Sequence, residues 1–494
     1  MADSQSSDQV IADPTYMANI RFFFRPEDIE HMAPKGIDLG TYDGVKANAA
    51  AIFAHTAPPN ADMPPDAAGK WSAERSQTFQ NWIVNGCPLG TATQPETGTY
   101  PTTPPPGARL RKNVTSLGDS EIEALKTAFS GLMERGASDP NGYFVLAGFH
   151  GLPNLWCLHH EDRFNPWHRY YLRVFEDALR SVPGCEEVTL PYWDISMPLP
   201  DLLQQPPFAS YTLPADPGDG FFPYTTERFS PAEIAQNVQD FGVLDDITTS
   251  LQQSLWGAYN TDGYQDFSIQ AHDGGHGSIG PTMAVQDVAS YDPVFWFFHC
   301  NLDRLWLSWQ TKVGGTTLPG FLSTVSAAHA IFFTNPAFNG LTGFPTATSE
   351  ETIEFGIAYD ELASVSLEEA PLENKVGSIE AVRSFSIERS APVSVRVKDI
   401  DRLNIPGSFV VSLLADGEPI AKRFFFQPRA PRHCDNCRAL PLANIDFRLD
   451  QEKLLDRKLS VAIDVPGHEE IDTRFPLSQA GNPTVNARLL LADE

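Results

Sequence analysis

The sequence predicts a multidomain, mainly α-helical protein with a four-helix-bundle core and a C-terminal antiparallel β-sandwich or barrel. Three observations predict this fold class. Apolar, aromatic segments with helical spacing fill the middle of the chain, a Pro/Thr-rich stretch precedes them, and residues 376–494 alternate between apolar and polar. A chain of 494 residues also has room for about three domains of roughly 150 residues each.

Residues 1–95 form the first predicted unit, a small helical domain. It contains an apolar patch, IRFFF, and two helical stretches, GVKANAAAIFAH and SAERSQTFQNWIVNGC. The segment TATQPETGTYPTTPPPGARL marks residues 96–110 as a linker, because Pro- and Gly-rich sequence does not build a packed element. We expect the first unit to act as a docking or lid domain.

The core, residues 111–365, holds two histidine clusters in aromatic helical surroundings. His272 and His276 are four residues apart, so one helix projects both rings from the same face. His159 and His168 are nine apart, too far for one straight helix to direct both at one ion, and Pro166 provides the break. We therefore predict four helices converging on one point. Six of the twelve histidines belong to the clusters: His150, His159, His168, His272, His276 and His299.

A two-metal site explains these histidines better than ordinary core packing does. A single histidine among aromatics is usually a satisfied core residue, but six buried rings would need six sets of hydrogen-bond partners. Neutral imidazoles suit copper, zinc, iron and nickel. The clusters have no carboxylate-rich companion, which weakens di-iron and di-manganese bundles and a di-zinc hydrolase. His160, beside His159, either contacts a ligand or faces solvent.

The remaining elements follow the same reasoning. Residues 200–245 are rich in Pro and Phe and are expected to form loops at the rim of the cavity. Beyond residue 376, turn signals such as DG and PG separate short alternating segments. Strands are predicted at 382–389, 393–400, 408–415, 421–428, 445–450, 458–465 and 487–493.

The charge and composition exclude several partners. A net charge of −28 argues against binding to nucleic acid or to an anionic membrane surface. The chain has no 18-residue apolar run, and its polar N-terminus lacks the features of a signal peptide, so we expect a cytoplasmic protein. Six cysteines in so long a chain are not a disulfide framework. A homo-oligomer is compatible with this composition.

The histidine segments resemble the type-3 copper proteins, namely tyrosinases, catechol oxidases (polyphenol oxidases) and molluscan haemocyanins. The segments HG…CLHH…FNPWHRYYLRVFE, PYWD at 191–194, HDGGH and YDPVFWFFHCNLDRLWLSWQ carry the resemblance, over roughly residues 111–312. It implies two copper ions, the first bound by His150, His159 and His168 and the second by His272, His276 and His299. It also implies oxidation of phenols and o-diphenols by O2 to o-quinones.

Other positions near the histidines add detail to the resemblance. Cys157, in a C-x-H with His159, implies a thioether to the histidine ring; a plain buried cysteine is the alternative. Three departures lie near the histidines, and in the family two of these positions, those of Asp273 and Gly277, border the substrate cavity. Asp273 replaces a common Asn and could hold a water, accept a proton or only bond local backbone. Gly277 is expected to leave the mouth open on its side, and Phe298 replaces a histidine and should alter substrate orientation.

The resemblance also implies that the C-terminal domain covers the site and keeps an enzyme latent. Phe425, or a neighbour in the Phe424–Phe426 run, is expected to plug the substrate pocket. Cys434 and Cys437 form a C-x-x-C, which reads as a disulfide or inert pair, a copper-delivery site, or a site for another metal.

Two further functions use the same six histidines. An o-aminophenol oxidase of secondary metabolism would have the same metal ligands. An oxygen carrier would keep the cavity closed to phenols, although this chain has no repeated copper unit. The resemblance covers both enzymes that hydroxylate monophenols, as a monooxygenase does, and enzymes that oxidise only o-diphenols.

Overall fold

The computed structural model describes most of residues 10–88, residues 107–257 and 263–317, isolated positions between 320 and 341, residues 355–363, and residues 392–466 and 474–489 apart from Leu455. The chain divides into two compact units. The first contains residues 1–102, 309–337 and 344–355, and the second contains residues 103–308, 338–343 and 356–494.

The first unit has a small helical core built on aromatic rings. Its helices are η1 (Ile20–Phe23), α2 (Tyr42–Ala47), α3 (Ala49–Thr56) and α4 (Ala73–Val84). Ser72 caps α4, because its side chain accepts a hydrogen bond from the backbone N–H of Arg75. Trp71, Phe79 and Trp82 pack edge to face or tilted against one another in its centre.

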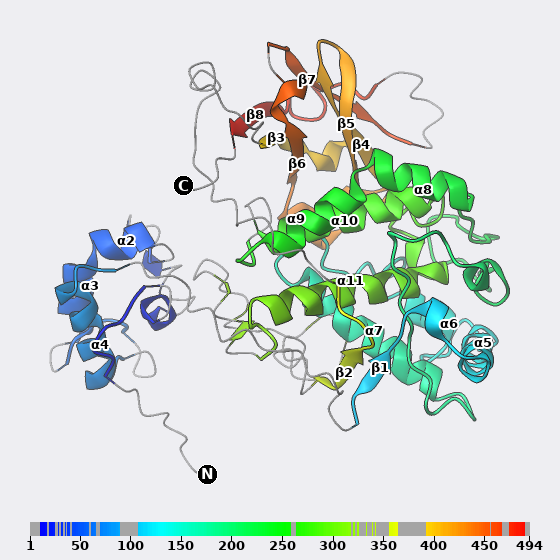
Figure 1. Cartoon of the computed structure of the whole chain (residues 1–494), viewed down its shortest axis with the longest axis horizontal. Coiled ribbons are helices and arrows are strands. Elements are labelled where there is room, and N and C mark those ends of the chain that lie inside the picture. The colour runs from blue at the N-terminus through cyan, green and yellow to red at the C-terminus, as the bar shows by residue number, and fades with distance from the viewer. Residues whose placement is uncertain are drawn as a thin grey trace. The chain divides into compact units, whose positions relative to one another are not determined.

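The second unit contains the helical core (Figure 1). Helix α10 packs against α9, α8 and strand β5, and α5 packs against α7. Helix α7 begins at Phe164, so Pro166 lies in its first turn, where a missing N–H does no harm. The helices are α5 (Asp119–Met133), α6 (Tyr143–Ala147), α7 (Phe164–Arg180), α8 (Pro231–Asp240), α9 (Val243–Gln252), α10 (Tyr264–Ile279) and α11 (Val294–Lys312).

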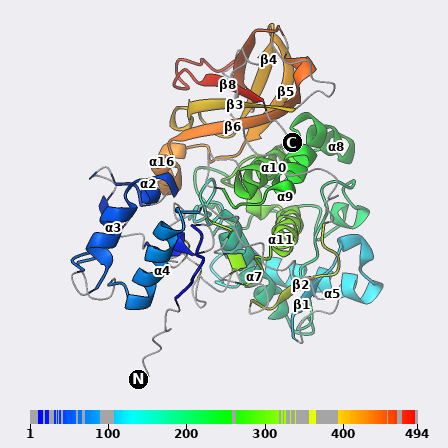
Figure 2. The same cartoon turned by 60° about the vertical axis from the view of Figure 1, so that its left-hand side comes forward.

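The C-terminal strands form two antiparallel three-stranded sheets, in the orders β6-β3-β8 and β5-β4-β7. Apolar side chains from both sheets share one core, which includes Val395, Val411, Phe447 and Ile463. Figure 2 shows these strands beside α10. The strands are β3 (Pro392–Asp401), β4 (Phe409–Ala415), β5 (Glu418–Phe425), β6 (Leu442–Asp450), β7 (Leu459–Asp464) and β8 (Thr484–Leu489).

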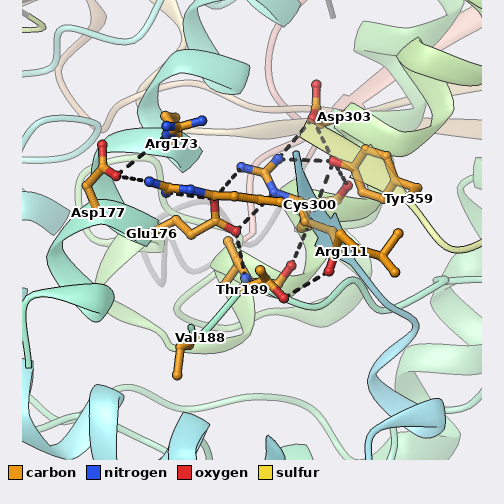
Figure 3. Close-up of polar contacts among 12 residues, drawn as sticks. Arg111, Arg173, Glu176, Asp177, Val188, Thr189, Cys300, Asp303 and Tyr359 are labelled. Carbon is orange, nitrogen blue, oxygen red and sulfur yellow. Dashed lines mark hydrogen bonds and ion pairs between the residues drawn. The ribbon is translucent and has the colours of Figure 1, made fainter. Parts of the chain in front are cut away.

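A buried ion network joins the two helices that carry His168 and His299. Strand β1 (Arg109–Arg111) pairs in parallel with β2 (Ile357–Tyr359) and directs the Arg111 side chain into the core (Figure 3). Arg111 contacts Glu176 of α7 and Asp303 of α11, with Nη1 of Arg111 3.1 Å from Oδ2 of Asp303. Asp303 also accepts from Nε of Arg169 at 2.5 Å and from the Tyr359 hydroxyl at 2.6 Å. The network therefore ties α7 to α11.

The predicted fold class is confirmed: a helical core with a C-terminal antiparallel β-domain. Two details are wrong. Residues 200–245, expected to be loops, contain α8 and the start of α9. His150 and His159 lie in turns, so three helices, not four, carry the histidines of the two clusters.

Some sequence-based expectations fall outside the described residues. The linker up to residue 106 and the strand expected at 382–389 belong to this group, so the domain boundaries stay predictions. Among the described residues, no helix is long and apolar enough to cross a membrane.

Candidate metal centre

The structure brings all six predicted histidines together in the interior of the second unit. His168 comes from α7, His272 and His276 come from successive turns of α10, and His299 comes from α11. His150 follows α6, and His159 lies in the turn before α7. Each of the six side chains is at most 4% exposed.

The ring nitrogens face one another across one shared space. The Nε2 atoms of His150 and His159 are 3.1 Å apart, and those of His276 and His299 are 3.0 Å apart. The His168 ring stacks on His299, with centroids 4.7 Å apart. Ligand atoms of three histidines, His272, His276 and His299, lie within 4.8 Å of one another, as do those of His150, His168 and His299. The two predicted triads therefore form one continuous cluster.

Three of the histidines are oriented by oxygen acceptors on their outer side. Nδ1 of His168 lies 2.8 Å from the Phe164 carbonyl, and Nδ1 of His276 lies 2.8 Å from the Met283 carbonyl. Nδ1 of His272 lies 2.8 Å from the Asp273 carboxylate. A carbonyl oxygen and an ionised carboxylate oxygen can only accept, so in each case Nδ1 carries the proton and Nε2 presents a lone pair to the shared space.

The electrostatics keep the rings neutral. Burial lowers the pKa of His168 and of His276 to about 3. Burial, reinforced by repulsion from neighbouring rings, lowers the pKa of His150, His159, His272 and His299 well below the usual value. Neutral imidazole is the form that binds a transition metal.

These residues fit a pair of copper ions. Nε2 of His168 and Nε2 of His272 are buried, and neither has a hydrogen-bond partner among the described residues. Buried polar atoms are rarely left so, and a metal at each would account for them. An all-imidazole set with oriented outer nitrogens is a ligand set that copper accepts.

Asp273 contacts both a histidine of the cluster and the segment of the β-domain that follows β5. Its Oδ1 contacts His272, and its Oδ2 lies 2.8 Å from Nε2 of His160 and 3.1 Å from the backbone nitrogen of Phe426. His160 in turn contacts Nη1 of Arg402 at 3.1 Å. The His160 ring is buried, so it does not face solvent, and it reaches the histidine His272 through Asp273.

The β-domain places an aromatic ring over the histidines. The Phe426 ring, just after β5, stacks on His276 with centroids 4.0 Å apart and 20° between the planes. It also lies 5.3 Å from His159 and 5.5 Å from His272. Phe425 instead stacks on His160 at 4.3 Å. The ring next to the histidines is thus that of Phe426, a neighbour of Phe425 in the phenylalanine run that the sequence analysis singled out.

Gly277 and Phe298 lie beside the cluster, but Gly277 does not leave an opening in this structure. A Cβ on Gly277 would meet the Phe424 ring at 2.4 Å, so the missing side chain makes room for a ring of the β-domain. Phe298 is fully buried, with its ring 5.4 Å from His276 and 5.5 Å from His299.

None of the six cysteines forms a disulfide in this structure. Sγ of Cys157 lies 3.2 Å from Nδ1 of His159, and the Gln286 amide donates to it at 3.1 Å. Cys434 and Cys437 are buried next to this segment. Nδ2 of Asn436, between them, donates to the His159 carbonyl at 2.5 Å.

Sequence reasoning missed the contacts through which the β-domain meets the core. Arg423 of β5 pairs with Asp246 of α9, with Nη2 3.0 Å from Oδ1. The backbone N–H of Arg429 donates to Asp287 at 2.8 Å. These partners are more than 140 residues apart, and no local pattern marks them.

Comparison with known proteins agrees with this geometry. A family model described as the common central domain of tyrosinase matches residues 140–231 and 224–312. Hemocyanin type 2 unit e of Rapana venosa is 34% identical over 236 residues, which cover 41% of this chain and 54% of that protein. A hemocyanin A-type polypeptide of Enteroctopus dofleini is 31% identical, with 41% of this chain and 18% of that protein covered. The chain thus spans about half of the first relative, and less of the second.

Solved structures share the fold. A tyrosinase from Burkholderia thailandensis has a TM-score of 0.55 at 18% identity, covering 77% of this chain and all of that one. A recombinant mushroom tyrosinase also has a TM-score of 0.55, at 15% identity, covering 78% of this chain and 93% of that one. A functional unit of octopus hemocyanin has a TM-score of 0.53 at 21% identity, covering 77% of this chain and all of that one.

Proposed function

We propose that this chain, whose central domain belongs to the tyrosinase-like family of type-3 dicopper proteins, oxidises phenols and o-diphenols to o-quinones with O2. The family binds two copper ions, and the six histidines fit them. The copper pair supplies the redox chemistry, in which two catechols and one O2 give two o-quinones and two waters. The observation that supports an oxidase is the Phe426 ring, since it shows that a phenol-sized ring fits against His276.

The residues around the copper pair would bind and orient the substrate. His276 offers a face on which an aromatic ring stacks, and Phe298 makes the wall beside it apolar. Asp273 holds the His272 ring with Nε2 inward. With the β-domain in place, all of these groups are buried, so the closed site holds little water.

The same contacts support a latent resting state. Phe426 occupies the position that a substrate ring would take, and Phe424 covers Gly277 beside it. The β-domain would therefore have to move before a phenol could enter. Cleavage within residues 364–391, which join the two parts of the unit, is expected to activate the enzyme.

The cysteines have two proposed roles. A thioether between Cys157 and the His159 ring would form with loss of two hydrogens, for which the copper site and O2 are the oxidant. Mass spectrometry of the copper-loaded chain would show that loss. Copper delivery is the role proposed for Cys434 and Cys437, because they adjoin the backbone of His159 through Asn436. A hydrogen bond from Cys434 and the nearby Arg402 lower the pKa of Cys437, which favours the metal-binding thiolate.

Oxygen carriage is the second candidate, favoured by the similarity to hemocyanins. Metal analysis together with O2 uptake separates the two. An oxidase should bind two coppers per chain and consume O2 with catechol, and more so after protease treatment. A carrier should bind O2 reversibly and leave catechol unchanged. A parallel assay with o-aminophenol tests for an o-aminophenol oxidase.

A further inference from the structure

The β-domain meets α8 and α9 at a cavity that none of the six histidines lines. Its volume is about 380 Å³, which is in the range of sites for small molecules. Strands β5 and β6 and the short helix η10 (Gln451–Lys453) form one wall. The end of α8 and the start of α9 form the other, and Figure 1 shows β5 beside α8. A ligand in this cavity would therefore contact the β-domain and the helical core at once.

The cavity is rich in cations, whereas the chain as a whole is strongly acidic. Acidic residues outnumber basic ones by 63 to 35 in the sequence, but four basic and two acidic side chains line the cavity. Arg423 is paired with Asp246, so three cations remain against two carboxylates. The four basic residues all belong to the β-domain, and the six charged side chains are Lys422, Arg423, Arg448, Lys453, Asp240 and Asp245.

Two of these cations have no counter-charge within the protein. Among the described residues, no group forms a hydrogen bond or an ion pair with the ammonium of Lys422 or of Lys453. The carboxylate of Asp240 accepts instead from the Gln236 amide, at 2.8 Å. Each lysine therefore has three N–H donors available to a ligand.

The core wall of the cavity is also positive at one point. Helix α9 begins there, and its N-cap residue Gly242 has no side chain to accept from the first N–H groups. The N-terminus of a helix carries a partial positive charge. The Arg423 guanidinium lies against it, since a Cβ on Gly242 would collide with that group. Asp245, in the first turn, offsets part of this charge, and an anion would offset more.

We propose that this cavity binds a small polyvalent anion of the phosphate or carboxylate class, and that the anion holds the β-domain against the core. Lys422 and Lys453 would bind it through charge-assisted hydrogen bonds, which are the stronger kind. The Gln239 amide would contact it from the core. Movement of the β-domain would separate the two walls, so the anion binds the closed state and stabilises it by mass action. Anion binding does not depend on the proposed oxidase function.

The first test is calorimetry on the copper-loaded full chain with inorganic phosphate, succinate and chloride at matched ionic strength. We expect a dissociation constant of roughly 1 mM or tighter for phosphate or succinate, and the tighter of the two identifies the class. Chloride should not bind measurably. The double variant Lys422→Gln/Lys453→Gln should weaken binding by about tenfold or more, because it removes two charged donors.

The matched control is Lys398→Gln/Lys458→Gln. It removes the same charge from the β-domain, but neither lysine lines the cavity, so the affinity should stay within about twofold. Absence of binding by both phosphate and succinate, or an equal loss of affinity in the two double variants, would overturn the proposal.

Hydrogen exchange tests the effect on closure. The backbone N–H of Phe426 donates to Asp273 of the core, so its exchange with solvent reports separation of the β-domain. Phosphate or succinate at ten times its dissociation constant should slow that exchange by about tenfold, and should not slow it in Lys422→Gln/Lys453→Gln. Binding without slower exchange at Phe426 would refute the role in closure.

Discussion

Removal of the Arg423 side chain should open the active site. Arg423 and Asp246 are 5% and 3% exposed, and their contacts are 2.8 Å between Nε and Oδ2 and 3.0 Å between Nη2 and Oδ1. Gly242 makes room for the guanidinium, since a Cβ there would lie 2.2 Å from Nη1. Loss of one partner of such a pair costs about 3–5 kcal/mol, because the other is left buried and unpaired.

That cost falls only on the closed state, since Asp246 becomes solvated when the β-domain leaves. In Arg423→Leu, the ratio of open to closed molecules should therefore rise by roughly 10²- to 10⁴-fold, up to full opening. The assay is the initial rate of 4-methylcatechol oxidation by the copper-loaded full chain, without protease. The rate should rise toward that of the protease-treated wild type.

The double variant Arg423→Leu/Asp246→Leu makes the test specific. Burial raises the pKa of Asp246 to about 7 despite the guanidinium, so desolvation offsets much of the attraction within the pair. Two apolar side chains should then restore closure, and activity should fall back toward wild type. The reasoning is refuted if the single variant stays as latent as wild type while Phe426→Ala is active, or if the double variant is as open as the single one.

Three further predictions concern packing, pH and the ion network. Gly277→Ala should raise activity without protease by about 10-fold or more, because its Cβ would meet the Phe424 ring at 2.4 Å and overpacking costs about 1–3 kcal/mol. Copper-free protein should lose stability as pH falls below about 6.5, because the pKa of His168 and of His276 is about 3 in the folded state and about 6.5 in the unfolded state. Each of the two histidines should lower the free energy of unfolding by about 2 kcal/mol at pH 5, and thermal unfolding would measure this loss. Asp303→Asn should lower the free energy of unfolding by roughly 3–5 kcal/mol, because it leaves buried arginines with less counter-charge, as denaturant titration would show.

Each of these three predictions has a control. Gly136→Ala adds a methyl where nothing lies within 4 Å, so the rate should not change. Copper-loaded protein should resist acid better than the copper-free form, because the metal competes with protons for the rings; equal losses would contradict the assignment. Asp177→Asn removes a carboxylate that is 46% exposed, and a loss as large as that of Asp303→Asn would show that burial is not the cause.

The metal cluster was largely predictable from sequence. A spacing of four on one helix puts His272 and His276 on the same face, and six imidazoles without carboxylates narrow the choice of metal. The turns that hold His150 and His159 were not foreseen as turns. Their positions depend on packing against other segments, which local spacing does not encode.

The β-domain shows a second limit of prediction from the sequence. Alternation predicted its strands, because a half-buried strand repeats every two residues. In a run of three phenylalanines, however, no alternation of apolar and polar residues shows which side chains point the same way. The sequence therefore does not indicate which ring contacts the histidines. The structure places Phe424 and Phe426, two apart, on Gly277 and His276, and Phe425 on His160.

The sequence by itself determined which residues can bind metal and where α10, α11 and most strands of the β-domain lie, since both depend on residue type and short-range periodicity. Only the tertiary structure decided what closes the site and what Asp273 contacts. Its partners His160 and Phe426 lie 113 and 153 residues away. Such contacts are set by how the two domains pack, which is a property of their surfaces and not of any local pattern.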